Sequence, residues 1–307
     1  MKKSLLILVL CSVVSSVEAQ TSANGTKPKA PVKSKKTSGK WDKGGIASFA
    51  VAQSGTRNWA AGGDRFSLSA NAFLYLYAKH TIGRGHWDNM VDASFGLLKS
   101  RAHGLVKNDD KLELTSRWSY ELGKKPIRHF RLGAVLNFRT QFADGYDYDD
   151  GRKRISAFLA PGIFTLSPGI QYFSNKETFS GHLGVASRSV LVANRPYELA
   201  ANYGVLPNSE VRIEAGLHAL FNYNKEVVKN VNLRSALDLF SDVVAKDPAN
   251  IDVYWTNMIN MRVNNWLNVI YSFDLKYDVN TRIFGYTKSR PDTQLKSVFG
   301  VGASVKF

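Results

Sequence analysis

Hydrophobic and polar residues alternate along the last stretch of the chain, 294–307. One set of alternate positions is largely apolar: Leu295, Ser297, Phe299, Val301, Ala303, Val305 and Phe307. The set between them is mostly small or polar: Lys296, Val298, Gly300, Gly302, Ser304 and Lys306. Successive side chains of a β-strand point to opposite faces, so the pattern predicts one strand with an apolar face and a small, polar face. The stretch 294–307 is more than twice as long as a typical strand of a globular protein, which has about five or six residues.

The same alternation recurs along the rest of the chain from Trp41 onward. In 129–139, for example, Leu132 and Leu136 alternate with Arg131 and Asn137. The pattern predicts twelve strands near 45–54, 65–79, 87–100, 111–122, 129–139, 156–172, 178–187, 211–222, 231–240, 251–263, 267–278 and 294–307. We expect the last strand to close on the first.

The predicted connections alternate in length. The short ones lie near 80–86, 123–127, 173–177, 224–230 and 264–266. The longer ones lie near 55–63, 101–110, 143–154, 188–209, 241–250 and 279–293. An even strand number with short turns at one end and long loops at the other is typical of outer-membrane β-barrels. Both termini then lie on the periplasmic side, and Trp87, Trp266 and Phe307 lie at the periplasmic rim.

Alternation alone does not say which face meets lipid. A soluble sandwich or a lipocalin-like barrel alternates too, with its apolar face turned inward. Long strands, alternating loop lengths and full charges on the polar face favour the membrane barrel. After the amino terminus no long apolar run occurs, and a barrel is the other structure that can span a membrane.

The first residues predict an export signal. Lys2 and Lys3 precede an apolar run, and Ala19 offers a small residue before a cut at Gln20. We therefore expect residues 1–19 to be a signal peptide, 20–40 a flexible basic periplasmic tail, and 41–307 the barrel. Cys11 is the only cysteine, so the exported chain has no disulfide and no cysteine metal site.

The formal net charge of +16 is unevenly spread, with six lysines in the predicted tail. Such a charge often indicates nucleic acid, but an exported chain rarely meets it. Anionic lipid headgroups and lipopolysaccharide phosphates are the expected partners. The tail is expected to be a solvated linker; a docking segment for a periplasmic partner is the alternative.

Charged residues on the polar face are the main candidates for function. The residues expected to face the lumen are Arg65, Asp88, Asp92, Lys111, Glu113, Arg117, Glu121, Arg131, Arg139, Arg212, Glu214, Arg234, Asp238, Asp252, Arg262, Asp274 and Lys276. Buried charges must pair or face water, so these side chains form either a paired structural network or a water-filled path. If the lumen conducts, the small basic excess predicts a preference for anions.

No catalytic constellation or metal site is visible in the sequence. His129, His182 and His218 are expected to face inward, without a recognisable Ser–His–acid arrangement. The acidic loop 143–154 lacks calcium-loop spacing, and basic residues follow its aspartates. In the longest loop, 188–209, Asn194, Pro196 and Gly204 predict a short capped helix that is either packed locally or placed as a lid over the barrel mouth.

Several motifs resemble one family. They are Asn58–Gly63, Trp87–Asn89, Asn108–Leu114, Asn137–Phe142 with Gly145–Tyr148, Phe158–Pro161, Asn230–Phe240, Asn250–Val253 and Gly300–Phe307. Over roughly 41–307 the chain resembles the Bacteroidota outer-membrane barrels grouped as domain of unknown function 3078. Asp144 stands where that family's pattern has a proline. The resemblance implies a barrel and an outer-membrane location, and it implies no substrate.

The terminal strand resembles the assembly signal of bacterial outer-membrane barrels, with Phe299, Val301, Val305 and Phe307 as its apolar residues. It implies insertion by the barrel-assembly machinery. For function two hypotheses remain open: passage or capture of a small polar or anionic solute, or a closed accessory barrel within a larger envelope assembly. An outer-membrane hydrolase is less favoured. No cofactor is expected.

Overall fold

The computed structural model describes residues 39–55, 66–100, 104–123, 129–148, 151–194, 196–206, 209–284 and 290–307. The predicted signal peptide and all but the end of the predicted tail lie outside these residues, as does Arg65. Residues 37–307 form one compact unit.

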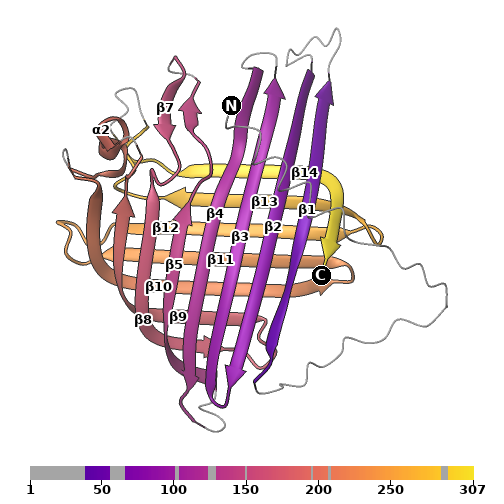
Figure 1. The fold of residues 1–307 in the computed structure, drawn as a ribbon, viewed down its shortest axis with the longest axis vertical. Helices are drawn as coiled ribbons and strands as arrows, with labels where there is room; N and C mark the ends of the chain where they lie inside the picture. The colour runs from indigo at the N-terminus through magenta and orange to yellow at the C-terminus, as the bar shows by residue number, and fades with distance from the viewer. Residues whose placement is uncertain are drawn as a thin grey trace. The chain divides into compact units, whose positions relative to one another are not determined.

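Twelve antiparallel strands close into a barrel, which confirms the predicted fold class (Figure 1). The strands are β1 (Trp41–Gly55), β2 (Phe66–Ile82), β3 (Gly85–Ser100), β4 (Gly104–Glu121), β5 (Phe130–Thr140), β8 (Gly162–Phe173), β9 (Phe179–Leu191), β10 (Val211–Val228), β11 (Val231–Asp242), β12 (Ile251–Arg262), β13 (Leu267–Tyr277) and β14 (Gln294–Lys306). Each pairs with its neighbours in chain order, and β14 pairs with β1. In Figure 1, β1 to β5 cross in front of β10 to β13.

All twelve predicted strands are present, but some boundaries were wrong. Strand β4 begins at Gly104, so most of the predicted connection 101–110 is strand. Strand β10 runs to Val228, so most of the predicted turn 224–230 is also strand. Charged residues suggested a loop in both places, whereas a barrel strand carries such residues on its inner face or beyond its apolar band.

The connection between β5 and β8 contains its own hairpin. Strands β6 (Gly145–Asp147) and β7 (Lys153–Ser156) pair antiparallel, within a segment predicted to be a loop or the start of a barrel strand. Arg154 on β7 donates to Asp144 at 3.0 Å and to Glu198 at 3.0 Å. The hairpin therefore contacts the loop that follows β9.

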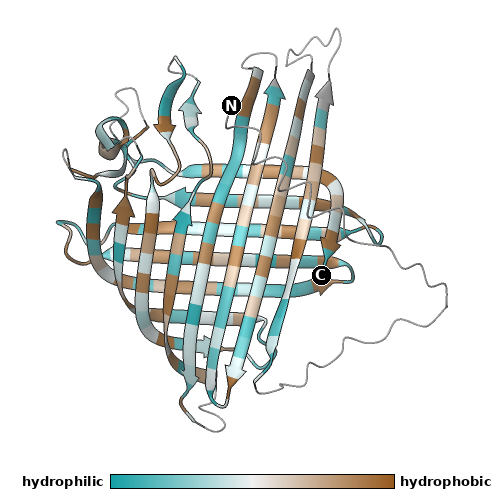
Figure 2. Cartoon of the chain, viewed as in Figure 1, coloured by the Kyte–Doolittle hydropathy of each residue, from teal (hydrophilic) through white to brown (hydrophobic). Residues whose placement is uncertain are grey.

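Hydrophobic and hydrophilic residues alternate along the barrel strands, as the colours of Figure 2 show, and many of the large apolar side chains are exposed. On β5, Leu132 and Leu136 are exposed, while Arg131, Val135 and Asn137 are buried. The outward side chains are highly exposed, Leu183 by 65% for example. A soluble barrel would turn this apolar face inward, so the exterior needs an apolar solvent.

Aromatic rings gather near the end of the barrel that carries the short turns. Trp41 and Trp87 lie with ring centroids 5.6 Å apart, and Phe130 and Tyr172 5.3 Å apart. Trp266 in the β12–β13 turn is also exposed at this end. Outer-membrane barrels carry such aromatic belts at the level of the lipid headgroups.

Strand β14 closes the barrel along a short seam. Its pairing with β1 runs from Val51 with Val301 to Ile46 with Lys306, and two backbone hydrogen bonds join Gly45 to Phe307. The prediction that the last strand closes on 45–54 is confirmed. Gly302 lies at the closest approach, where a Cβ would collide with the carbonyl oxygen of Phe49.

The loops opposite the turns pack on one another. Helix α2 (Pro196–Leu199) and the 3-10 helix η2 (Ala200–Tyr203) end at Gly204, which has a φ of 65°, as the helix prediction required. A buried cluster joins this loop to 157–160 and the end of β9: Ala157, Ala160, Val190, Val192, Leu199, Ala200, Tyr203 and Val205. The loop therefore packs on its neighbours in the chain. In the described part of the chain no helix is long and apolar enough to cross a membrane.

Candidate functional site: the barrel lumen

Most of the charged residues predicted for the lumen lie inside the barrel in ion pairs. They are Asp88, Asp92, Lys111, Glu113, Arg117, Glu121, Arg131, Arg139, Arg212, Glu214, Arg234, Asp238, Asp252 and Asp274. Lys276 lines a small inner cavity. Arg262 is the exception among the described residues, because its side chain is exposed at the turn end, where it donates to Asn230.

Arg139 forms the central crossing of the lumen. From β5 it donates to Glu113 on the adjacent β4 at 3.0 Å and to Asp238 on the opposite wall, β11, at 2.6 Å. Its guanidinium lies 4.2 Å from the ring centroid of Tyr254. His218 Nε2 lies 3.2 Å from the same Asp238. One guanidinium with fixed donors thus ties two walls together.

A second group of charges pairs beside it. Lys111 lies 3.0 Å from Asp92, and Arg234 from β11 lies 3.8 Å from the other oxygen of that carboxylate. The Arg234 guanidinium also lies 3.7 Å from the ring centroid of Tyr75. Asp92 therefore shares its charge between two walls.

A third group of ion pairs is centred on Lys296 and joins two walls of the barrel. The sequence prediction included neither Lys296 nor its partner Asp109. Its ammonium lies 2.7 Å from Asp109 on β4 and 2.6 Å from Asp274 on β13. Lys296 stands on the polar face of the terminal strand but was not counted among the candidates. Asp109 had been placed in a loop, although it continues the inward alternation of Lys111 and Glu113.

A buried charged layer centred on Arg188 lies toward the loop end of the lumen. Arg188 donates to Glu214 at 2.6 Å and also to Asp252, and its guanidinium lies 3.9 Å from the ring centroid of Phe240. Arg188, Glu214 and Asp252 are all buried. Arg188 was missed because β9 was predicted to stop at 187. Extending its alternation by one residue would have placed Arg188 inside.

The loops lie directly on this layer. Asn280 donates to Glu214 at 3.1 Å, and the backbone of Val279 donates to Asp252 at 3.1 Å. Arg282 then joins the same connection to η2 through a backbone hydrogen bond to Asn202. The loop cluster and the charged layer are therefore continuous among the described residues.

A further set of charges lies toward the turns, on the wall formed by β3, β4, β5 and β8. Arg117 lies 3.1 Å from Asp88, and Arg131 lies 3.6 Å from Glu121. The two guanidinium groups lie near one ring, Phe173, at 4.8 Å and 4.0 Å from its centroid. The side chains of Arg117, Arg131 and Phe173 therefore occupy the space inside this part of the barrel.

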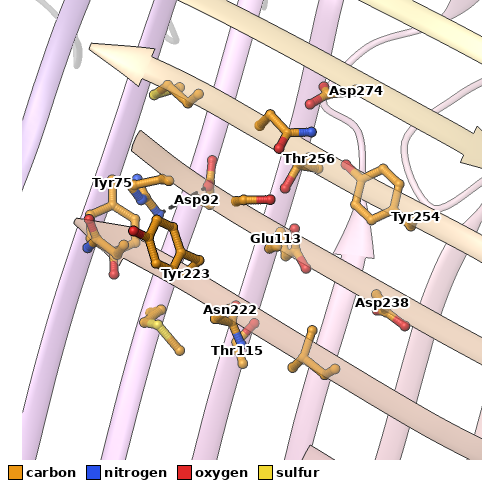
Figure 3. Close-up of a pocket in the computed structure, with 18 of the residues that line it drawn as sticks. Tyr75, Asp92, Glu113, Thr115, Asn222, Tyr223, Asp238, Tyr254, Thr256 and Asp274 are labelled. Carbon is orange, nitrogen blue, oxygen red and sulfur yellow. Dashed lines mark ion pairs between the residues drawn. The ribbon is translucent and has the colours of Figure 1, made fainter. Parts of the chain in front are cut away.

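Between these layers lies a cavity of about 220 Å³ (Figure 3). It reaches the turn end at Lys79, Glu177, Thr178 and Asn224, where the side chains of Glu177 and Asn224 are exposed. A second cavity of about 30 Å³ lies further in.

The two cavities share four lining residues: Arg139, His218, Asp238 and Tyr254. These four residues around Arg139 therefore separate the two cavities, and we call them the Arg139 partition. Arg188 and Asp252 line the smaller cavity on its other side. Among the described residues, the large cavity reaches the turn end, and the buried Arg188 layer lies beyond the smaller cavity on the loop side.

Basic and acidic side chains balance in the wall of the large cavity. The basic ones are Lys79, Lys111, Arg117, Arg139, Arg234 and Lys296; the acidic ones are Asp92, Asp109, Glu113, Glu177, Asp238 and Asp274. The basic excess expected from the sequence is therefore absent from this wall, and so is the basis for an anion preference.

One serine and one histidine meet inside the barrel. His182 Nε2 lies 2.7 Å from the hydroxyl of Ser167, which also donates to the carbonyl of Val185 at 3.0 Å. His182 and His218 lie with ring centroids 5.5 Å apart. Ser167 is fully buried and is not among the residues that line the large cavity.

No group of three or more histidine, cysteine, aspartate or glutamate side chains converges on a metal position in the described part of the chain. In the loop 143–154, Asp144 is paired with Arg154. Asp149 and Asp150 of the same loop lie outside the described residues.

Comparison with known proteins gives one family. Residues 51–146 match the family described as Protein of unknown function (DUF3078). Over that stretch the chain is similar to this family. The DUF3078 stretch contains the motifs Trp87–Asn89 and Asn108–Leu114, whereas those from Phe158 onward lie outside it. It supplies Asp92, Glu113 and Arg139, which form one wall of the cavity.

A search among curated proteins finds no match. Among solved structures, an outer membrane channel from Pseudomonas putida F1 is similar at 13% identity and a TM-score of 0.40, covering 92% of this chain and all of that chain. The translocator domain of the autotransporter NalP from Neisseria meningitidis has 9% identity and a TM-score of 0.32, covering 86% and 88%. The β domain of the Bordetella autotransporter BrkA has 12% identity and a TM-score of 0.30, covering 86% and 99%. These scores are low, so the barrel rests on its own strand pairing.

Proposed function

We propose that this protein is an outer-membrane β-barrel that captures a small polar solute in its lumen without forming an open pore. Support for the membrane comes from the outside of the barrel, where long strands expose apolar side chains and aromatic rings gather at one end. An apolar exterior of this kind is stable only in lipid.

The orientation follows from the connections. Outer-membrane barrels carry short turns toward the periplasm and long loops outside. The turns β2–β3, at 83–84, and β10–β11, at 229–230, therefore face the periplasm, together with Phe307. The cavity then opens to the periplasm, and the Arg188 layer with its loops closes the outer end.

The observation that carries the proposal is the closed outer end of a hollow lumen. Passage would require both the Arg139 partition and the Arg188 layer to open. The Arg188 layer consists of buried ion pairs and the Arg139 partition of half-buried ones, so opening either would separate paired charges inside the lumen. Capture needs neither to open, because the large cavity already reaches the turn end.

The proposed partners follow from the location. Lipid and lipopolysaccharide would surround the barrel, and the lysine-rich sequence of 20–40 suits anionic headgroups or other envelope proteins as partners. The barrel-assembly machinery inserts it through the terminal strand. We propose no role in binding nucleic acid and no catalytic role.

Two measurements test this function. Cell fractionation and gel mobility with and without boiling should place a heat-modifiable protein in the outer membrane. Recovery of the protein in the soluble periplasm would refute the membrane assignment. Single-channel recording of the refolded protein should give a silent bilayer, and stepwise conductance would refute the closed lumen.

A second candidate is a closed accessory barrel within a larger envelope assembly. The ion pairs that join opposite walls favour it, because they would serve rigidity equally well. Solute binding separates the two candidates: an accessory barrel has no need of it.

A further inference from the structure

We infer that the solute captured in the large cavity is electrically neutral and rich in hydroxyl groups, of about the size of a monosaccharide. This inference rests on the proposed function and specifies its ligand. It draws on the charges, the hydrogen-bonding groups and the volume of the cavity, and each of the three restricts the solute in a different way.

Most fixed charges of the cavity are already engaged in ion pairs; among the described residues Lys79, at the mouth near the ring of Tyr77, is the exception. Arg139 is held by Glu113 and Asp238, and Lys296 by Asp109 and Asp274. An anion that recruited either cation would leave a carboxylate of the mostly buried cavity wall without its partner, which is costly. The same holds for a cation that recruited one of the carboxylates. The wall therefore favours a solute without charge.

Neutral groups supply the remaining hydrogen-bonding capacity. The hydroxyls of Tyr75, Tyr223, Tyr254 and Thr256 and the amide of Asn222 line the cavity and make no hydrogen bond within the described part of the chain. They come from β2, β10 and β12 and surround the cavity in Figure 3. Hydroxyls and amides both donate and accept, which suits a ligand whose own groups are hydroxyls.

The apolar part of the cavity wall can pack against the carbon–hydrogen groups on the ring face of such a solute. The cavity wall includes the rings of Phe73 and Tyr223 and the flexible side chains of Met90 and Met258. Aromatic rings and methionines give apolar contact without fixing a charge. A ligand with hydroxyls on its edge and carbon–hydrogen groups on its face meets both kinds of surface.

The volume sets the size. The cavity of about 220 Å³ lies below the ~300 Å³ at which pockets for drug-sized ligands begin. It holds several waters or one small ring molecule, since a water occupies about 30 Å³ of the liquid. A single monosaccharide or cyclic polyol is the expected occupant.

Calorimetry on the folded full-length protein in detergent tests the ligand class. The probes are glucose, N-acetylglucosamine and myo-inositol, with glucuronate, glucosamine and glucose 6-phosphate as charged counterparts of similar shape. We expect binding of at least one neutral probe and much weaker binding of its charged counterparts. The variants Tyr223→Phe and Asn222→Ala should each weaken that binding about threefold to tenfold, as the loss of one neutral hydrogen bond requires. Tyr197→Phe, in an exposed loop position, is the matched control and should bind as the wild type does.

The route of entry is tested by a single introduced cysteine in a Cys11→Ser background. A bulky maleimide on Asn224→Cys, at the cavity mouth, should abolish binding of the neutral probe. The same label on Tyr197→Cys, among the loops, should leave it unchanged. Blockage from the loop position alone would overturn entry from the turn end.

The outcomes separate this inference from the function on which it rests. If a charged probe binds as tightly as its neutral counterpart, the ligand class is wrong and capture stands. If no probe binds and the bilayer is silent, capture and its ligand both fail, and the accessory barrel remains. If a neutral probe binds but the bilayer shows stepwise conductance, the ligand class stands and the closed lumen fails.

Discussion

Arg139 is the side chain on which the interior of the barrel most depends. Its guanidinium satisfies Glu113 and Asp238 at once and stacks on Tyr254. Removing one partner of a buried ion pair is far more costly than the pair itself is stabilising, because the remaining charges stay buried.

Arg139→Ala should therefore lower the free energy of unfolding by about 3–5 kcal/mol. Denaturant titration of the refolded protein, followed by tryptophan fluorescence, measures this change. The control Arg290→Ala removes an exposed arginine 4.0 Å from Asp292 and should change stability by less than about 1 kcal/mol. Adding Glu113→Gln and Asp238→Asn to Arg139→Ala should restore much of the loss; no recovery would refute the stranded-charge explanation.

Tyr203 makes the stability of the packed loop cluster depend on pH in the alkaline range. Its hydroxyl donates to the carbonyl of Ile155 at 2.8 Å, and burial raises the pKa of its phenol above the usual range. When the loop opens, the phenol ionises near pH ~10, whereas in the packed loop it stays neutral. The packed loop is thus fully favoured below pH ~10 and loses stability above it, by about 1.4 kcal/mol per pH unit.

We expect protease cleavage in this loop to accelerate about tenfold per pH unit above pH ~10 in the wild type relative to Tyr203→Phe. The variant lacks the titrating hydroxyl, so it corrects for the protease's own pH dependence. Equal pH profiles for the two proteins would show that Tyr203 does not control the loop.

At the scale of elements, strand β14 has two separate tasks. It pairs with β13 from Gln294 to Ala303 and with β1 from Val301 to Lys306. The exchange of partners takes place around Gly302, where the strands approach most closely.

Gly302→Ala should therefore weaken closure by about 1–3 kcal/mol, the usual effect of overpacking. Thermal conversion of the folded gel band to the unfolded one measures it. The control is Gly181→Ala, where the nearest atom to a new Cβ, on Phe221, lies at an ordinary 3.5 Å. If both variants converted at the wild-type temperature, the seam would tolerate a side chain.

The end of β14 is expected to act in assembly more than in stability. Phe307 and Leu295 are equally exposed, at 64% each, on the same face of the strand. Phe307→Ala should lower the amount of heat-modifiable protein in the outer membrane severalfold, while Leu295→Ala leaves it nearly unchanged. Refolding of both variants in detergent should be similar. A parallel refolding defect would mean that Phe307 serves stability instead.

Boundaries were the weakest part of the prediction at this scale. Alternation identified every barrel strand, because a period of two sustained over many residues is specific to a strand with two different faces. It missed Arg188 and Asp109, since both lie where strands continue past residues typical of loops. The β6–β7 hairpin was missed because segments so short give no period.

At the scale of the whole molecule, the sequence showed which side chains face inward but not how they pair. The crossing from Arg139 to Asp238 joins residues far apart in the chain, and so does that from Lys296 to Asp109. Such pairs depend on which walls of the barrel approach each other, which alternation does not encode. For the same reason, the closed outer end and the cavity could not be predicted.

The closed outer end also bears on how the cell can use this protein. A porin admits antibiotics and bile salts together with nutrients, so the number of porins sets the permeability of the envelope. Under the proposed function, a barrel sealed by the Arg139 partition and the Arg188 layer would add nothing to that permeability. Because two barriers lie in series, the loss of either one alone leaves the other in place. A cell can therefore keep such a protein at high copy number without becoming more sensitive to toxic compounds.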